Sequence, residues 1–256
     1  MTELEILQIV LLVIAGLGAG LINTIVGSGS LITFPALLAL GYSPVLANVT
    51  NNVGVLPGSI SGAIGYRREL RGDWRSVLPL AAAACAGGAA GALLLLVLPP
   101  EIFDGAVPLL IALACVLVIF GPTLKRRLAM TQDSYGVFRE NRTGLSTATA
   151  LTGVYGGYFG AAQGVILLAI LSIMLKGSMQ RANAVKNVLA AASNSAAAVV
   201  FLVLTPVDWF AAGVIAFGAV LGGQIGAKIG RRIPELALRI TIVAVGIVAI
   251  VALLIT

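Results

Sequence analysis

The chain alternates between long apolar stretches and short polar ones. Most of the apolar stretches are close to the roughly 20 residues that a helix needs to cross the hydrocarbon of a membrane. Two of them, 27–40 and 164–175, are too short to cross upright and predict helices that break or re-enter. The expected segments are 5–26, 27–40, 44–66, 75–98, 101–121, 143–161, 164–175, 182–205, 208–230 and 234–255. This pattern predicts an all-α fold.

Composition places these helices in a membrane. Of 256 residues, 59% are hydrophobic and 10% are charged, whereas roughly a quarter of the residues in an ordinary soluble domain are charged. The mean hydropathy is +1.06. The first apolar stretch follows Glu3 and Glu5 rather than basic residues, so we expect it to stay in the mature protein. The chain is therefore expected to be an integral, multi-pass membrane protein in contact with lipid.

Polar landmarks repeat at a spacing of 135 residues. ANVTNN at 47–52 corresponds to ANAVKN at 182–187, and Asp73-Trp74 corresponds to Asp208-Trp209. A gapless alignment at this spacing pairs 19–121 with 154–256. The halves look like duplicated units. We divide the chain into a first membrane repeat at 1–121, a cytoplasmic connecting loop at 122–142 and a second membrane repeat at 143–256.

Basic residues predict how the halves are oriented. Fourteen of the sixteen Lys and Arg residues lie in four clusters, at 67–75, 125–142, 176–181 and 228–232. Short loops rich in Lys and Arg stay in the cytoplasm, and the clusters at 67–75 and 228–232 have bare counterparts in the other half. This predicts two inverted repeats of about five membrane segments each, with both termini outside, as in many secondary transporters. The charges do not decide between ten crossings and six crossings plus two re-entrant hairpins.

The two predicted helix breaks fall at GSGS, 27–30, and AAQG, 161–164, which the same spacing relates to within one residue. Irregular backbone at membrane depth needs protein or a water-filled cavity around it. The short helix after each break offers free N–H groups and the positive end of its dipole, which attract anions. The alternative is a glycine-rich bend whose hydroxyls bond to their own backbone. The candidate binding residues here are Ser28, Gly29, Ser30, Gln163 and Gly164.

Two polar stripes interrupt otherwise apolar segments. Each has its members at helical spacings of three and four, so they share one face of a helix. Polar residues in membrane segments normally face the bundle interior, and an ionisable one is a functional candidate. We expect both stripes to form an anion site between the halves; the alternatives are interhelical hydrogen bonds for the amides and a lysine that reaches cytoplasmic water. The stripes are Asn48, Asn51 and Asn52, and Asn183, Lys186 and Asn187.

Small residues and tryptophans predict packing rather than chemistry. Glycines four residues apart, such as Gly16 with Gly20 and Gly218 with Gly222, let membrane helices approach closely. Trp74 and Trp209 open their segments and are expected to anchor them at the membrane interface.

Missing residue types exclude several kinds of function. The chain has no histidine, which excludes a histidine-assisted serine protease and histidine-ligated metal chemistry. No Asp or Glu lies deep within a predicted span, and Cys85 and Cys115 lie in separate apolar stretches as small packing residues. We therefore expect no enzyme, catalytic residue, metal, cofactor or nucleic-acid partner. The remaining amides, hydroxyls, lysine and helix ends suit the binding of an oxyanion.

The sequence resembles the TauE/SafE family of bacterial sulfite and organosulfonate exporters. The resemblance covers nearly the whole chain, and the stretches at 27–70 and 179–201 carry it. It implies a permease of the bacterial inner membrane that exports small sulfur-containing anions such as sulfite, sulfoacetate or other sulfonates.

These observations together predict a secondary transporter that exports a small sulfur oxyanion by alternating access. Two other functions stay open: a passive anion channel through the same polar stripes, and a non-transporting membrane scaffold or assembly factor. The sequence also leaves open the native anion, the coupling ion and a homodimer.

Overall fold

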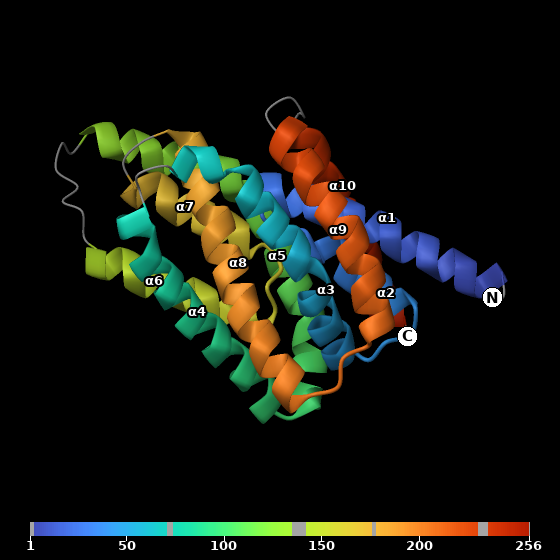
Figure 1. Ribbon diagram of the computed structural model, residues 1–256. Coiled ribbons are helices and arrows are strands. Elements are labelled where there is room, and N and C mark those ends of the chain that lie inside the picture. Colours follow the sequence, from blue (N-terminus) through green and yellow to red (C-terminus); the bar gives the residue numbers. More distant parts are fainter. Residues whose placement is uncertain (1–2, 71–73, 135–141, 176–177, 230–234, 256) are drawn as a thin grey trace.

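The computed structural model describes residues 3–70, 74–134, 142–175, 178–229 and 235–255. These residues form ten α-helices and one short 3-10 helix, with no strand among them, so the predicted all-α class is confirmed (Figure 1). The helices are α1 (Glu3–Ile25), α2 (Ser30–Ala39), α3 (Pro44–Gly65), η1 (Arg67–Leu70), α4 (Trp74–Val97), α5 (Pro100–Ser134), α6 (Arg142–Tyr158), α7 (Gln163–Met174), α8 (Met179–Leu204), α9 (Trp209–Ile229) and α10 (Glu235–Ile255).

Helices are expected in the apolar interior of a membrane, because a helix forms the hydrogen bonds of its backbone N–H and carbonyl groups within one segment. Among the described residues, five helices are long and apolar enough to cross a membrane: α1, α4, α5, α8 and α9. α5 continues as a helix to Ser134, so the first part of the predicted connecting loop at 122–142 is helical. Residues 135–141 of that loop lie outside the described residues.

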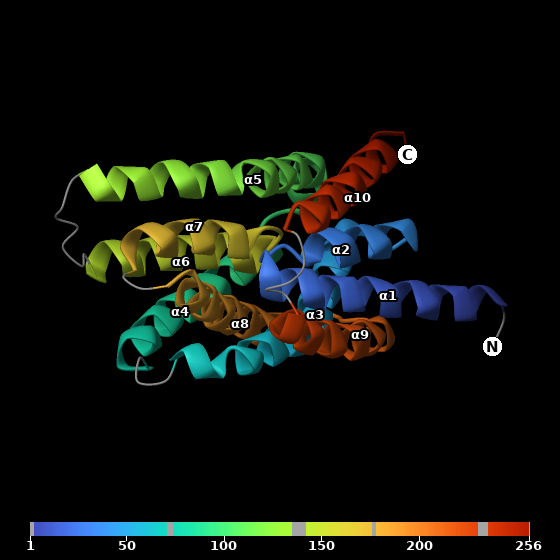
Figure 2. The same ribbon diagram turned by 90° about the horizontal axis from the view of Figure 1, so that it is seen from above.

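Two helical hairpins enter the bundle from opposite ends. α1 packs against α2, and α6 packs against α7. Figure 2 shows the α1–α2 hairpin coming from the side of the N-terminus and the α6–α7 hairpin from the other side, with their connecting loops meeting in the interior. Both predicted breaks are therefore real, and each turns the chain back along the preceding helix.

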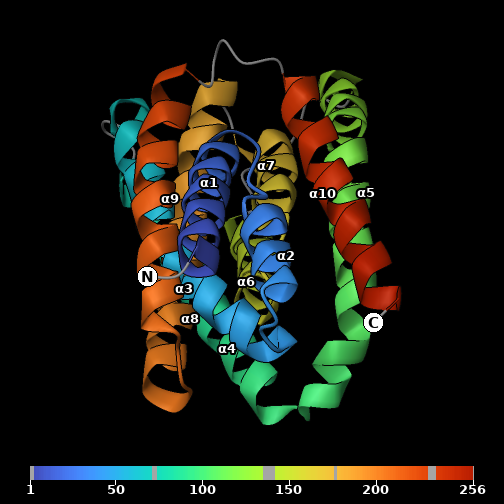
Figure 3. The ribbon, with the colours of Figure 1, turned by 90° about the vertical axis from the view of Figure 1, so that its right-hand side faces the viewer.

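The remaining helices pair in matched sets. α9 packs against α1 and α3, whereas α4 packs against the equivalent helices α6 and α8. Figure 3 shows α9 beside α1 at one edge of the bundle and α10 beside α5 at the other. Duplication predicts this matching of contacts, while the inverted orientation of the halves across a membrane stays a prediction.

Glycine contacts give the register of the repeat. A Cβ on Gly87 would lie 2.1 Å from the carbonyl oxygen of Ala150, and a Cβ on Gly222 would lie 2.0 Å from that of Leu17. Gly87 and Gly222 are 135 positions apart, but Leu17 and Ala150 are 133 apart. The gapless alignment is thus wrong by two residues in the hairpins. α7 has 12 residues and α2 has 10, which restores the spacing of 135 from α3 onward.

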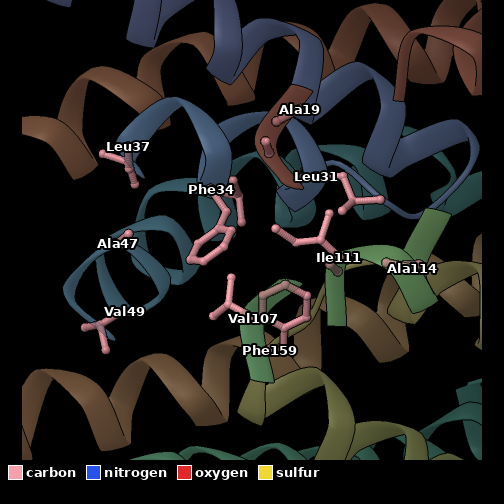
Figure 4. Close-up of a cluster of buried hydrophobic side chains, with 14 of the residues drawn as sticks. Ala19, Leu31, Phe34, Leu37, Ala47, Val49, Val107, Ile111, Ala114 and Phe159 are labelled. Carbon is pink, nitrogen blue, oxygen red and sulfur yellow. The ribbon is translucent and has the colours of Figure 1, made fainter. Parts of the chain in front are cut away.

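An aromatic cluster holds the hairpin tips against α5. Phe34 of α2 meets Phe159, just after α6, edge to face with ring centroids 5.3 Å apart. Phe103 of α5 lies 5.5 Å from the Tyr158 ring. Figure 4 shows Val107 and Ile111 of α5 completing this buried apolar layer. Edge-to-face pairs add about 0.5–1.5 kcal/mol each beyond the area they bury, so the tips are firmly placed.

Candidate functional site

Glycines in the left-handed region end both first hairpin helices. Gly27 follows α1 with φ +93°, and Gly160 follows α6 with φ +78°. The Gly27 N–H donates to the Ile22 carbonyl at 3.0 Å, and the Gly160 N–H donates to the Tyr155 carbonyl at 3.1 Å. Such a backbone conformation favours glycine because it has no Cβ. The breaks in the two halves are therefore built alike.

The two breaks touch each other through their backbones. The Gly164 N–H, in the first turn of α7, donates to the Gly27 carbonyl at 2.9 Å. A Cβ on Gly27 would lie 2.4 Å from the Gly164 Cα, so neither position has room for a side chain. The two breaks therefore meet in the interior of the bundle. Their depth in a membrane stays a prediction.

Polar donors without partners are buried at this meeting point. The Ser28 side chain is 1% exposed and the Gln163 side chain is 3% exposed. Among the described residues, neither the Ser28 hydroxyl nor the Gln163 amide nitrogen has a hydrogen-bond partner. A buried polar group left unsatisfied costs about 1–3 kcal/mol. Gln163 is the first residue of α7, and Ser28 lies two residues before α2. Both therefore present donors to which a ligand oxygen could bind.

Gly29 has a packing role that the sequence did not show. A Cβ there would lie 2.2 Å from the Ala19 carbonyl oxygen and 3.0 Å from the Asn23 Cβ. Gly29 thus lets the start of α2 lie directly on α1. Valine at this position would collide with the α1 backbone, so we expect Gly29→Val to disturb folding, and it cannot serve as a test of binding.

The second-half stripe lies at the end of α1. The Lys186 ammonium donates to the carbonyls of Asn23 at 3.0 Å and Thr24 at 3.2 Å. The amide nitrogens of Asn183 and Asn187 also donate to the Thr24 carbonyl, each at 3.3 Å. The predicted shared face of α8 is confirmed. Since Lys186 is 0% exposed, the alternative in which this lysine reaches water is wrong.

The first-half stripe lies at the end of α6. The Asn48 amide nitrogen donates to the Tyr158 carbonyl at 2.9 Å. The Asn51 side-chain oxygen accepts a hydrogen bond from the Thr33 hydroxyl of α2, and the Asn52 side-chain oxygen is buried without a partner among the described residues. The two stripes thus contact two different helix ends. That they form one anion site between the halves stays a prediction.

Sequence reasoning missed the acceptors of these stripes. These acceptors are the backbone carbonyls of Asn23, Thr24 and Tyr158. They lie in the last turns of α1 and α6, just before the breaks. The one sequence signal was the polar pair Asn23-Thr24 within an apolar run. Ser30, one of the expected binding residues, is the first residue of α2 and is half-buried.

Comparison with known proteins decides the family. The family model described as "Sulfite exporter TauE/SafE" matches residues 12–253. The chain belongs to the TauE/SafE family. No solved structure matches the chain.

Relatives of this TauE/SafE protein are named as membrane transporters. A "probable membrane transporter protein" of Haemophilus influenzae is 30% identical over 213 residues, covering 83% of this chain and 81% of the relative. The "probable membrane transporter protein ORF9" of Sinorhizobium sp. is 30% identical over 229 residues, covering 89% and 85%. The "probable membrane transporter protein YfcA" of Escherichia coli K12 is 29% identical over 212 residues, covering 82% and 76%. The protein is thus a multi-pass membrane transporter of the TauE/SafE family.

Proposed function

We propose that this transporter exports a small sulfur oxyanion, such as sulfite, sulfoacetate or another organosulfonate, across the bacterial inner membrane. The carrying observation is the contact between the two helix breaks, where the Ser28 hydroxyl and the Gln163 amide nitrogen are buried without hydrogen-bond partners among the described residues. The family description supports a sulfur anion, since it reads "Sulfite exporter".

Donors at the breaks favour an anion over a cation. α2 and α7 both begin there, and the dipoles of these helices add partial positive charge at their first turns. The N–H groups of Gln163 and Gly164 are already bonded, to the Gly160 and Gly27 carbonyls, so the donors left for a ligand are side chains. The Lys186 ammonium lies at the end of α1, only a few residues before the break, and adds a full positive charge nearby. A sulfite or sulfonate group has three oxygens, so it can accept from several of these donors at once.

The hairpins supply a means of alternating access. They come from opposite ends of the bundle and meet at the breaks (Figure 2). A rocking movement of one hairpin and its covering helices against the other would open the site first to one side and then to the other. With the cell interior negative, export of a monovalent anion is favoured by about 2.3 kcal/mol per 100 mV. The membrane potential can therefore drive export without a coupled ion.

A thermal-shift screen of the purified protein tests this function. The ligands are sulfite, sulfate, thiosulfate, sulfoacetate, taurine and acetate. Binding to the native state raises apparent stability with the logarithm of ligand concentration over Kd, so we expect the sulfur oxyanions to give the largest shifts. Ser28→Ala should weaken the preferred anion at least tenfold, about 1.4 kcal/mol, while the free protein stays folded.

Thr149 offers a matched control. Its hydroxyl is also buried, at 1% exposure, and also has no partner among the described residues, but it lies in the middle of α6. Thr149→Val should leave anion binding unchanged. Equal losses in Ser28→Ala and Thr149→Val would remove the site from the breaks.

Flux measurements separate the competing functions. Saturable uptake into proteoliposomes, stimulated by the same anion on the opposite side, would support a carrier. Flux without such stimulation would indicate a passive channel. No anion-dependent shift and no flux would point to a scaffold.

A further inference from the structure

The carbonyl end of α1 is an unusually electronegative place inside this bundle. The last carbonyls of a helix have no N–H partner within it and carry a partial negative charge. At α1 these groups are turned toward α8 rather than toward water, since Lys186 is 0% exposed and Asn183 and Asn187 are 8% and 4% exposed. A cation at this point would be stabilised strongly because the surroundings are apolar and buried.

Lys186 fills this place with its own ammonium group. An ammonium has three donors and no acceptor, and two of the donors are directed at the Asn23 and Thr24 carbonyls at 3.0 and 3.2 Å. The flanking amides of Asn183 and Asn187 reach the same Thr24 carbonyl. The Thr24 oxygen therefore accepts three hydrogen bonds from one face of α8.

The equivalent end of α6 shows that a lysine is not needed for packing alone. Asn51 occupies the position in α3 that Lys186 occupies in α8, and it bonds to Thr33 of α2 instead of to the α6 end. There, Asn48 alone of the stripe reaches the terminal carbonyl of Tyr158. The contact of α3 with the α6 end is thus made by a neutral amide, whereas the contact of α8 with the α1 end has a charged side chain in addition to its amides.

We propose that Lys186 is a covalently attached substitute for a bound monovalent cation at the carbonyl end of α1. In transporters with broken helices, unwound carbonyls and half-helix C-terminal ends bind free Na⁺ or H⁺. Here the ammonium occupies the corresponding position permanently. The protein therefore needs no free cation at this end of the hairpin, and removing the lysine side chain creates a site for an alkali or alkylammonium ion. This inference rests on the Lys186 contacts and not on the identity of the transported anion.

Cation rescue of Lys186→Ala tests the inference. The variant is purified in the presence of methylammonium and its thermal unfolding is measured in Na⁺, K⁺, methylammonium and choline chlorides at one ionic strength. We expect saturable stabilisation of Lys186→Ala by methylammonium or Na⁺ relative to choline, and no such difference in the wild type. Lys228→Ala, which removes an exposed lysine in the last turn of α9, should respond like the wild type.

A second variant protects the test against a failure to fold. Lys186→Met keeps the length of the side chain and fills its space without charge, so it should unfold at a lower temperature than the wild type and ignore all four cations. A Lys186→Met protein as stable as the wild type would overturn the proposal. So would the absence of any cation-specific shift in Lys186→Ala, or an equal shift in the wild type. Because chloride is the common anion and no sulfur oxyanion is added, these outcomes are independent of the transport proposal.

Discussion

Several polar side chains in this transporter form hydrogen bonds to the ends of helices. Asn48 and Lys186 donate to carbonyls at the ends of helices in the interior. Asp208 caps the start of α9. Its carboxylate accepts from the Ala211 N–H at 2.9 Å. The other carboxylate oxygen accepts from the Tyr42 hydroxyl at 2.6 Å, which ties the loop before α3 to the loop before α9.

This pair predicts a pH-dependent stability. The Tyr42 hydrogen bond holds the pKa of the Asp208 carboxyl below its usual value, with help from the Ala211 and Phe210 N–H groups and against burial, which raises it. Burial and the same hydrogen bond raise the pKa of Tyr42 to about 12, so the hydroxyl remains a donor at neutral pH. Because the folded pKa of Asp208 is depressed, its stabilisation is present above the unfolded pKa of about 3.9 and is lost as pH falls through the folded pKa.

Tyr42→Phe should therefore lower the melting temperature at pH 7 by an amount equivalent to about 1 kcal/mol or less, since both side chains are only half-buried. The difference from the wild type should shrink as pH falls below about 4. Thermal melts from pH 7 to pH 3 measure it. In an Asp208→Asn background the same substitution should show little pH dependence, and a pH-independent difference in the wild-type background would contradict the assignment.

Pairs of helices in this bundle lie backbone to backbone. The α1–α9 contact places Gly218 and Gly222 against the backbone of α1, and Gly16 and Gly20 against that of α9. With the hydrophobic effect absent between helices in lipid, such close packing is a main source of association. The predicted packing role of these glycines is confirmed.

Two glycines of α9 give a matched test of this packing. A Cβ on Gly222 would lie 2.0 Å from the Leu17 carbonyl oxygen, whereas a Cβ on Gly213 would meet no described residue within 4 Å. Gly222→Leu should prevent a monodisperse folded protein or lower its melting temperature sharply. Gly213→Leu should be neutral, although both changes raise helix propensity equally. Size-exclusion profiles and thermal melts compare them; a stable Gly222→Leu protein would show that α1 and α9 can separate.

Both hairpins and the matched helix pairs define the whole molecule. The basic clusters predict that the halves are inverted in the membrane, with both termini outside. In a background lacking Cys85 and Cys115, single cysteines at positions 43, 99 and 206 should react with an impermeant maleimide added from the periplasmic side. Cysteines at 71 and 126 should not. Labelling of 71 and 126 from the periplasm would overturn the inverted arrangement.

The fold followed from the sequence because its signals are coarse and repeated. Ten apolar runs and two glycine breaks gave the helices and the hairpins. The site was harder to predict, because the spacing of residues along the chain does not show which groups their side chains will bind. Asn183, Lys186 and Asn187 share a face as predicted, yet what that face meets is a set of backbone carbonyls that any residue could supply. The two-residue shift in the hairpins could not be seen in the sequence either. Leu17 and Ala150 lie in apolar runs with no distinctive residue that would align one half with the other.

The capping of α1 by α8 bears on how the protein is made. The Thr24 carbonyl leaves the ribosome long before Lys186, which lies 162 residues further along the chain, and the α6 end is completed by Asn48 from the earlier half. Each half supplies the group that finishes a helix of the other. The carbonyl end of α1 therefore lacks these hydrogen bonds until most of the chain has been synthesised. A gene cut between the halves should give product only when both pieces are made in the same cell.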